Sequence, residues 1–246
     1  MRCASVRTIS QEARDTFKTI ERFAGIRILR GDYFVQPMLE RAGVRGASRV
    51  LILADASGAA RSATEVDAKT VMTAMTIDRM APDVYVAAEL LDVRFETYLK
   101  MAHVDEIVYS NEYARILLAN SVKSAGLAHI VFDLLDIGTD ARILTIPLPE
   151  EIAGRTFADV IAHCKSVHRS IAIGIVENTG KIREMKKEAL RQAQKNPNTR
   201  TVLRNLKEVR NIGTNSPVLN PAKTYVVKPY SRAVIIANAK LARMSG

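Results

Sequence analysis

The 246-residue sequence has the composition of a soluble globular protein, with 48% hydrophobic and 25% charged residues. Two cysteines are too few for a disulfide framework, and no apolar stretch approaches the roughly 20 residues that a membrane-spanning helix needs. The net charge of +10 is concentrated in residues 181–214, which hold ten Lys or Arg against three Glu, a surplus of +7. This segment has no aromatic residue, so it lacks the stacking side chains typical of single-strand nucleic-acid binders.

The first half of the chain alternates strands and helices. Residues 1–24 are irregular, with a short strand at Val6–Ile9 and a helix at Gln11–Arg22 as the only predictions. The later strands are predicted at Gly25–Leu29, Arg49–Ala54, Asp83–Ala88 and Glu106–Tyr109, and the helices at Phe34–Ala42, Ala63–Met80, Arg94–Ala102 and Glu112–Ala125. Near-continuous apolar strands between helices indicate a parallel sheet that is covered on both faces.

The second half has the pattern of a smaller α+β lobe. Strands are predicted at Arg142–Leu148, Ser170–Val176, Lys223–Val227 and Ala233–Ala237, with a helix at Arg155–His163 and a loop at Ser216–Pro221. Residues 181–214 are interpreted as a basic helical insertion, solvated or in contact with acidic lipid or a partner. We therefore expect an α/β chain with two domains: residues 1–138 form an incomplete doubly wound, Rossmann-like sheet, and residues 139–246 the smaller lobe.

Several short motifs, in order, resemble one family. They are Gly31-Asp32 after a strand, Leu39–Gly43 in the next helix, Val104–Ile107 before a later strand and Gly154–Phe157 at the entry to the C-terminal helix. This pattern, which covers about residues 25–180 and 215–240, resembles the regulator-of-potassium-conductance (RCK) domain, or TrkA N-terminal domain, followed by the TrkA C-terminal domain. The sequence departs from the pattern at His103, where the family usually has Gly.

The resemblance implies a cytosolic, non-enzymatic regulatory module at the inner face of the cell membrane. Such a module senses a ligand and controls potassium flux through an attached pore or, alternatively, as a peripheral subunit of a separate uptake transporter. It also implies a homodimer as the building block, since the helix matching Glu112–Ala125 crosses to a second subunit in the family. A Rossmann-type oxidoreductase is a rival, but the sequence shows neither a glycine-rich turn nor a catalytic motif.

The resemblance further implies a missing piece. Such domains have the strand order 3-2-1-4-5-6 and open with a glycine-rich turn, yet the sequence contains no G-x-G-x-x-G. The four strands from Gly25 onward correspond to the third through sixth, so we expect a split sheet with open apolar edges. We expect the chain to be a fragment of a longer protein with a pore upstream. The alternatives are a gene model that starts too late and another chain that supplies the missing strands.

Four residues are candidate ligand contacts at the carboxyl ends of the strands. Gly31 and Asp32 follow the first strand, where the resemblance implies that Asp32 approaches the adenine or ribose of a nucleotide; turn formation is the alternative. Asp55 begins a small-residue loop with room for a phosphate, although helix capping explains the same residues. Glu89 ends the strand at Asp83–Ala88.

The cofactor expectation follows from these positions and from the resemblance. An adenine nucleotide is expected only for an intact parent, because the absent glycine turn would cradle its phosphates. In some calcium-gated members of the family, a Glu matching Glu89 acts with a second Glu two residues later and with a carboxylate on the preceding strand. Here those positions are Leu91 and Ala54. Calcium needs six to eight oxygen ligands, so the residues argue against calcium and favour a hydrogen-bonding role for Glu89.

Overall fold

The computed structural model describes residues 4–6, 27–29, 31–55, 62–136, 138–179 and 215–238. The chain divides into two compact units, Met1–Tyr113 and Ala114–Gly246, and each is described here by itself. The division falls within a helix, upstream of the predicted domain boundary at residue 138, and the domain limits stay a prediction. The predicted helix at Gln11–Arg22 and the insertion at 181–214 lie outside the described residues.

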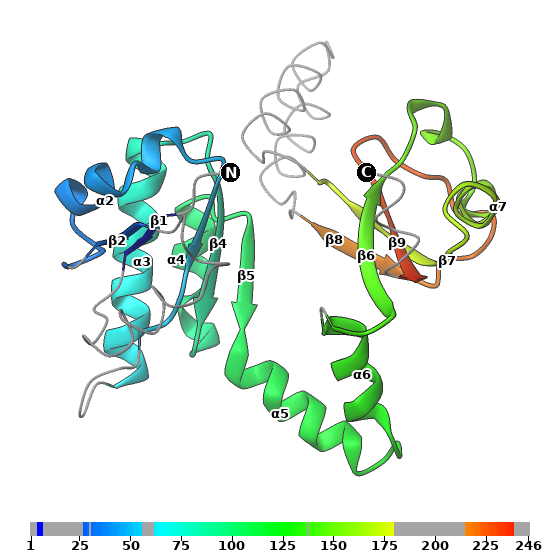
Figure 1. Ribbon diagram of the computed structural model, residues 1–246, viewed down its shortest axis with the longest axis horizontal. Coiled ribbons are helices and arrows are strands. Elements are labelled where there is room, and N and C mark those ends of the chain that lie inside the picture. Colours follow the sequence, from blue (N-terminus) through cyan, green and yellow to red (C-terminus); the bar gives the residue numbers. More distant parts are fainter. Residues whose placement is uncertain are drawn as a thin grey trace, which may run out of the picture. The chain divides into compact units, whose positions relative to one another are not determined.

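The first unit is an α/β structure with parallel strands, as predicted (Figure 1). Its elements are β1 (Ala4–Val6), β2 (Arg27–Leu29), α2 (Gln36–Ala42), η2 (Val44–Gly46), β3 (Arg49–Ile52), α3 (Ala63–Met80), β4 (Tyr85–Leu90), η3 (Val93–Phe95), α4 (Glu96–Met101), β5 (Glu106–Tyr109) and the start of α5 (Ser110–Ser121). The helix predicted at Arg94–Ala102 thus opens with a 3₁₀ turn, and α5 ends before the predicted Ala125.

The strands of the first unit form two separate sheets, which confirms the predicted split within the described residues. β1 pairs in parallel with β2, and β3, β4 and β5 form a second parallel sheet in that order. The short strand predicted at Val6–Ile9 lies at Ala4–Val6, and its pairing with β2 was not predicted. In the order 3-2-1-4-5-6, β1 and β2 match the second and third strands, so the described strands lack one position, not two.

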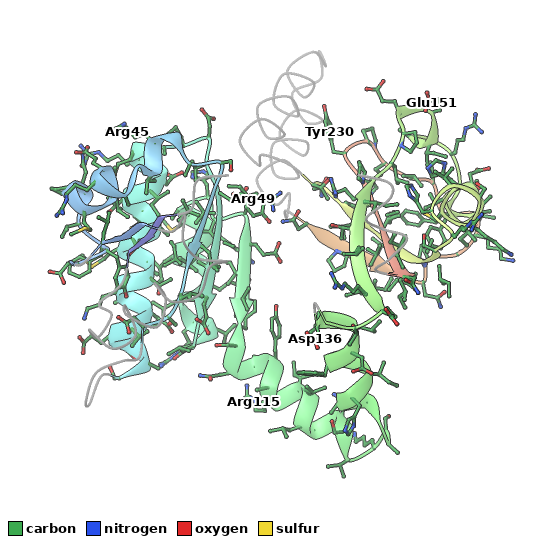
Figure 2. The ribbon with its side chains drawn as sticks, viewed as in Figure 1. Arg45, Arg49, Arg115, Asp136, Glu151 and Tyr230 are labelled. Carbon is green, nitrogen blue, oxygen red and sulfur yellow. The ribbon has the colours of Figure 1, made fainter. Side chains whose placement is uncertain are left out.

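One face of the three-stranded sheet is packed and the other is open. The packed face meets α3 and α4 through fully buried Ile77, Leu90 and Leu99. Arg45 ties η2 to the end of α3 by donating from Nη1 to the carbonyl oxygen of Met80 at 2.9 Å (Figure 2). On the opposite face of β3, the side chain of Leu51 is 63% exposed.

The second unit contains a four-stranded antiparallel sheet in the order β6-β9-β7-β8. Its elements are the rest of α5, α6 (Leu127–Leu135), β6 (Ala141–Pro147), η4 (Glu150–Ile152), α7 (Phe157–Val167), β7 (Ile171–Glu177), β8 (Ser216–Leu219) and β9 (Arg232–Asn238). The core between α7 and the sheet is built around Val160, Cys164 and Ile175. α7 begins with a capping box, in which Thr156 and Asp159 each satisfy the other's backbone N–H.

Two predictions for the second unit were wrong. Ser216–Leu219 is a strand and not a loop, because Pro217 lies on an edge strand where a missing N–H is tolerated. Lys223–Val227 is not a strand: only Val226 forms a single bridge, to Thr156. Leu127–Leu135, for which no element was predicted, is a separate helix that starts after Gly126 in the left-handed conformation with φ +80°.

Candidate ligand site at the carboxyl edge of the parallel sheet

The carboxyl ends of β3 and β4 are joined by a side chain of the site. Glu89 lies in β4, and its Oε2 accepts a hydrogen bond from the backbone N–H of Ala54, just beyond β3, at 2.9 Å. β3 and β4 are in parallel register, so their carboxyl ends meet at the same edge of the sheet. Glu89 therefore stands where ligands bind in open α/β sheets, and it already has a backbone partner.

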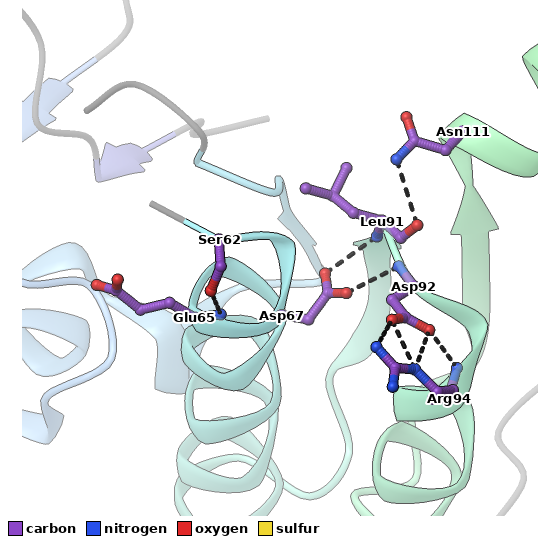
Figure 3. Close-up of polar contacts among 7 residues, drawn as sticks. All are labelled: Ser62, Glu65, Asp67, Leu91, Asp92, Arg94 and Asn111. Atoms are coloured by element: carbon purple, nitrogen blue, oxygen red, sulfur yellow. Dashed lines mark hydrogen bonds and ion pairs between the residues drawn. The ribbon is translucent and has the colours of Figure 1, made fainter. Parts of the chain in front are cut away.

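A second carboxylate at this edge comes from helix α3. Asp67 is completely buried, and its two oxygens accept hydrogen bonds from the N–H groups of Leu91 at 3.0 Å and Asp92 at 2.8 Å (Figure 3). Burial raises the pKa of the Asp67 carboxyl above its ordinary value, and the charges of Asp92 and Glu89 act in the same direction. The two amide donors oppose this shift by stabilising the charged form.

The loop after β4 is also held from the side of α5. Nδ2 of Asn111, in the first turn of α5, donates to the carbonyl oxygen of Leu91 at 3.3 Å. Asp92 caps η3 and accepts hydrogen bonds from the backbone and side chain of Arg94 (Figure 3). The N–H groups of Leu91 and Asp92 are therefore bonded to α3, and the carbonyl oxygen of Leu91 is bonded to α5.

Gly31 and Asp32 occupy the turn between β2 and α2. Gly31 has φ +152°, a backbone conformation that residues with a side chain rarely adopt, so the turn favours glycine there. The carbonyl oxygen of Asp32 accepts from the N–H of Val35 at 3.2 Å, and its side chain is exposed. The turn interpretation explains both residues, while a nucleotide contact by Asp32 stays a prediction.

The helix cap after β3 is supplied by a residue other than those predicted. Ser62 caps α3 by accepting from the N–H of Glu65 at 3.2 Å. Asp55 is half-buried at the start of this connection and remains a candidate contact. Within the part of the chain that the structure describes, no three His, Cys, Asp or Glu residues come together in a way that could hold a metal ion.

Sequence reasoning missed Asp67. The residue is one of three acids in an 18-residue helix, and the other buried positions of this helix are mostly apolar or threonine. The one signal in the sequence was that Asp67 shares a helix face with these apolar and threonine residues, which predicts a buried carboxylate. A second buried acid, Asp105 of the motif at Val104–Ile107, lies at the opposite end of β4, where its carboxylate accepts from the N–H of Val86 at 2.8 Å. The motif at Val104–Ile107 thus has a structural explanation.

Comparison with known proteins finds a family match in the first part of the chain. Residues 8–88 match the family model of the calcium-activated potassium channel slowpoke-like RCK domain. This stretch is therefore similar to an RCK domain. The resemblance seen in the motifs is thereby confirmed, and with it the Rossmann-like α/β fold of this part.

Two curated relatives of the chain are named as potassium channels. The chain is 24% identical over 147 residues to the calcium-gated potassium channel TvoK of Thermoplasma volcanium, covering 60% of this chain and 42% of the relative. It is 23% identical over 163 residues to the putative potassium channel protein YugO of Bacillus subtilis, covering 63% and 46%. The chain therefore spans less than half of the length of these curated relatives.

A solved structure extends the fold similarity over the whole chain. The human SLO3 gating ring superposes with a TM-score of 0.60 at 16% identity, covering 99% of this chain and 40% of that one. At this identity the match supports a shared fold for both units. None of the helices described is long and apolar enough to cross a membrane.

Proposed function

We propose that this chain is part of a cytosolic, ligand-sensing module that controls potassium flux through an attached or associated membrane pore. The observation that carries the proposal is the RCK match at residues 8–88, supported by two potassium-channel relatives. RCK domains are regulatory, so the module acts by binding and not by catalysis. A ligand controls a pore in this way only through a difference between its affinities for two arrangements of the module.

The ligand site of the proposal is the carboxyl edge formed by Asp32, Asp55 and Glu89. Asp32 is exposed and available to a ribose or base, and Glu89 is half-buried at the end of β4. An adenine nucleotide suits hydrogen-bonding carboxylates at this edge. Calcium is the competing probe because TvoK is named as calcium-gated, although Leu91 and Ala54 supply no carboxylates here. The site must therefore be tested with both ligands.

The partners of the proposal are a pore and a second copy of this chain. No residue of α5 or α6 is buried within the described structure. Exposed apolar side chains of these two helices and of the connection between them are Tyr113, Ile116, Leu118, Val122, Ile130, Phe132 and Leu135. An apolar surface of this kind is typical of an interface between subunits. Contact of residues 181–214 with acidic lipid remains a further prediction from charge alone.

The decisive experiment records potassium currents from the membrane protein that carries or binds this chain. ADP or Ca²⁺ is applied to the cytosolic side in planar bilayers. We expect one of the two to change the open probability at unchanged unitary conductance, and Glu89→Gln or Asp32→Asn to reduce that response. Potassium current that is the same with and without the chain would refute the function. A response that persists in both variants would move the site elsewhere.

A further inference from the structure

The loop Leu91-Asp92, immediately after β4, is held by two helices at once. Asp67 of α3 accepts the N–H groups of both residues, and Asn111 of α5 donates to the carbonyl oxygen of Leu91. The loop follows Glu89 by only two residues, so a displacement of the end of β4 is transmitted directly to it. Figure 3 shows Asp67 and Asn111 reaching the loop from opposite sides.

The two attachments differ in strength. Asp67 is fully buried, so releasing its two amide donors would leave a buried carboxylate without partners, which is strongly unfavourable. Asn111 is exposed and makes one longer, neutral hydrogen bond, which water can replace at small cost. The loop is therefore bound firmly to α3, and the bond to α5 is the one that yields.

The helix on the yielding side connects the two units. α5 runs without interruption from Ser110 to Ser121, while the division between the compact units falls at Tyr113/Ala114. Its first turn belongs to the RCK-domain side, and the rest belongs to the second unit. A change at the first turn is thus passed along a continuous hydrogen-bonded helix.

We propose that Asp67, the loop Leu91-Asp92 and Asn111 form a relay between the end of β4 and the helix that leads into the second unit. Asp67 is a positioning residue in this relay. A ligand that engages Glu89 takes its carboxylate away from the N–H of Ala54, shifts the end of β4 and strains the bond from Asn111 to Leu91. That a ligand binds at Glu89 rests on the proposed function. The linkage from Asp67 to α5 does not depend on any ligand.

Amide hydrogen exchange on the ligand-free 246-residue chain tests the linkage. The readouts are the amides of Leu91 and Asp92 and those of Ala114–Leu117, which bond back to the first turn of α5. In Asp67→Asn we expect exchange at least ten-fold faster at the loop and several-fold faster at Ala114–Leu117. Glu65→Gln, which removes an exposed acid from the same helix, is the matched control and should change neither.

The double variant decides whether Asn111 is the link. Asn111→Ala alone should speed exchange at Ala114–Leu117, and adding Asp67→Asn to it should bring no further increase there. Additive effects at α5, or faster exchange confined to the loop, would overturn the relay. Asn111→Ala changes an exposed residue and so keeps the test available if Asp67→Asn does not fold. Failure of ADP and Ca²⁺ to affect channel currents would refute the proposed function and leave this result standing.

Discussion

The hydroxyl of Tyr225 donates a hydrogen bond to the carboxylate of Glu177, and Nζ of Lys228 donates to the other oxygen at 2.9 Å. Glu177 ends β7 and is buried, while both donors lie on the segment that runs toward β9. Burial by itself would raise the pKa of the Glu177 carboxyl, but the two hydrogen bonds outweigh it and hold the pKa below its ordinary value.

Tyr225→Phe should lower the free energy of unfolding by about 1–3 kcal/mol at pH 7, because a buried carboxylate loses a donor. The folded pKa of Glu177 lies below its unfolded value, so its contribution is complete above the ordinary glutamate pKa of 4.5 and is lost as the pH falls through the folded pKa. Urea unfolding between pH 7 and pH 3 should therefore show the difference between wild type and variant narrowing with acid. Tyr230→Phe changes an exposed tyrosine of the same segment and should have no such effect; a constant difference at all pH values would contradict the assignment.

His103 has a left-handed backbone conformation with φ +51°, at the position where RCK domains usually have glycine. Its Nδ1 lies 3.3 Å from a carboxylate oxygen of Asp78. His103→Gly and His103→Ala both lose this contact, but only glycine adopts positive φ without strain. We expect the Gly variant to be more stable than the Ala variant by about 1 kcal/mol in chemical denaturation. Equal stability of the two variants would show that the backbone there is unstrained.

The antiparallel strands β7 and β8 stay paired up to the residues where the chain leaves β7 and re-enters β8, which we call the neck. Glu177 pairs with Ser216, the N–H of Asn215 donates to the carbonyl oxygen of Asn178, and both asparagines have positive φ, +53° and +49°. Two consecutive residues with positive φ are what a type I′ turn requires. Deleting residues 179–214, with Asn215→Gly at the new junction, should therefore give a chain that still unfolds cooperatively.

The same deletion with Ala at both junction positions is the matched control, because alanine is strained at positive φ. It should melt at a lower temperature than the Asn-Gly version in circular dichroism. If the two junctions melt together, the neck does not form a tight turn, and if neither folds, residues 179–214 contribute to the lobe.

The apolar surface of α5 and α6 should support self-association. Phe132 is 68% exposed, and Phe132→Asp places a charge in the proposed subunit interface. We expect this variant to shift the chain toward monomer in sedimentation velocity, with its melting curve unchanged. Val93→Asp, at a 56% exposed position in η3, is the control that should leave the assembly intact. Unchanged sedimentation of the Phe132 variant would place the interface elsewhere.

The strands and long helices of the first unit were predictable because their signals are local. The strand at Arg49–Ile52 is apolar after its first residue, and α3 ends two residues before Pro82. The hydrogen bonds of Asp67 to the loop Leu91-Asp92 were not predictable, since they depend on which loop the helix meets after folding. The edge strand at Ser216–Leu219 was missed for a related reason: Pro217 argues against a strand unless its position at the edge of the sheet is known.

For the candidate site, sequence reasoning predicted a hydrogen-bonding role for Glu89 at the carboxyl edge of the sheet, but not the group to which it is bonded. The partner of its carboxylate is the backbone of Ala54, which no pattern of side chains reveals. Gly31 was interpreted through the family, whereas its φ of +152° favours glycine on backbone grounds.

The closed neck at Asn178 and Asn215 also bears on how this lobe diverges. Because the register of β7 and β8 is already set at Glu177 and Ser216, the chain between them is free to lengthen or shorten without disturbing the sheet. Descendants of a common ancestor can therefore gain, exchange or discard whole segments at this point while keeping the same scaffold.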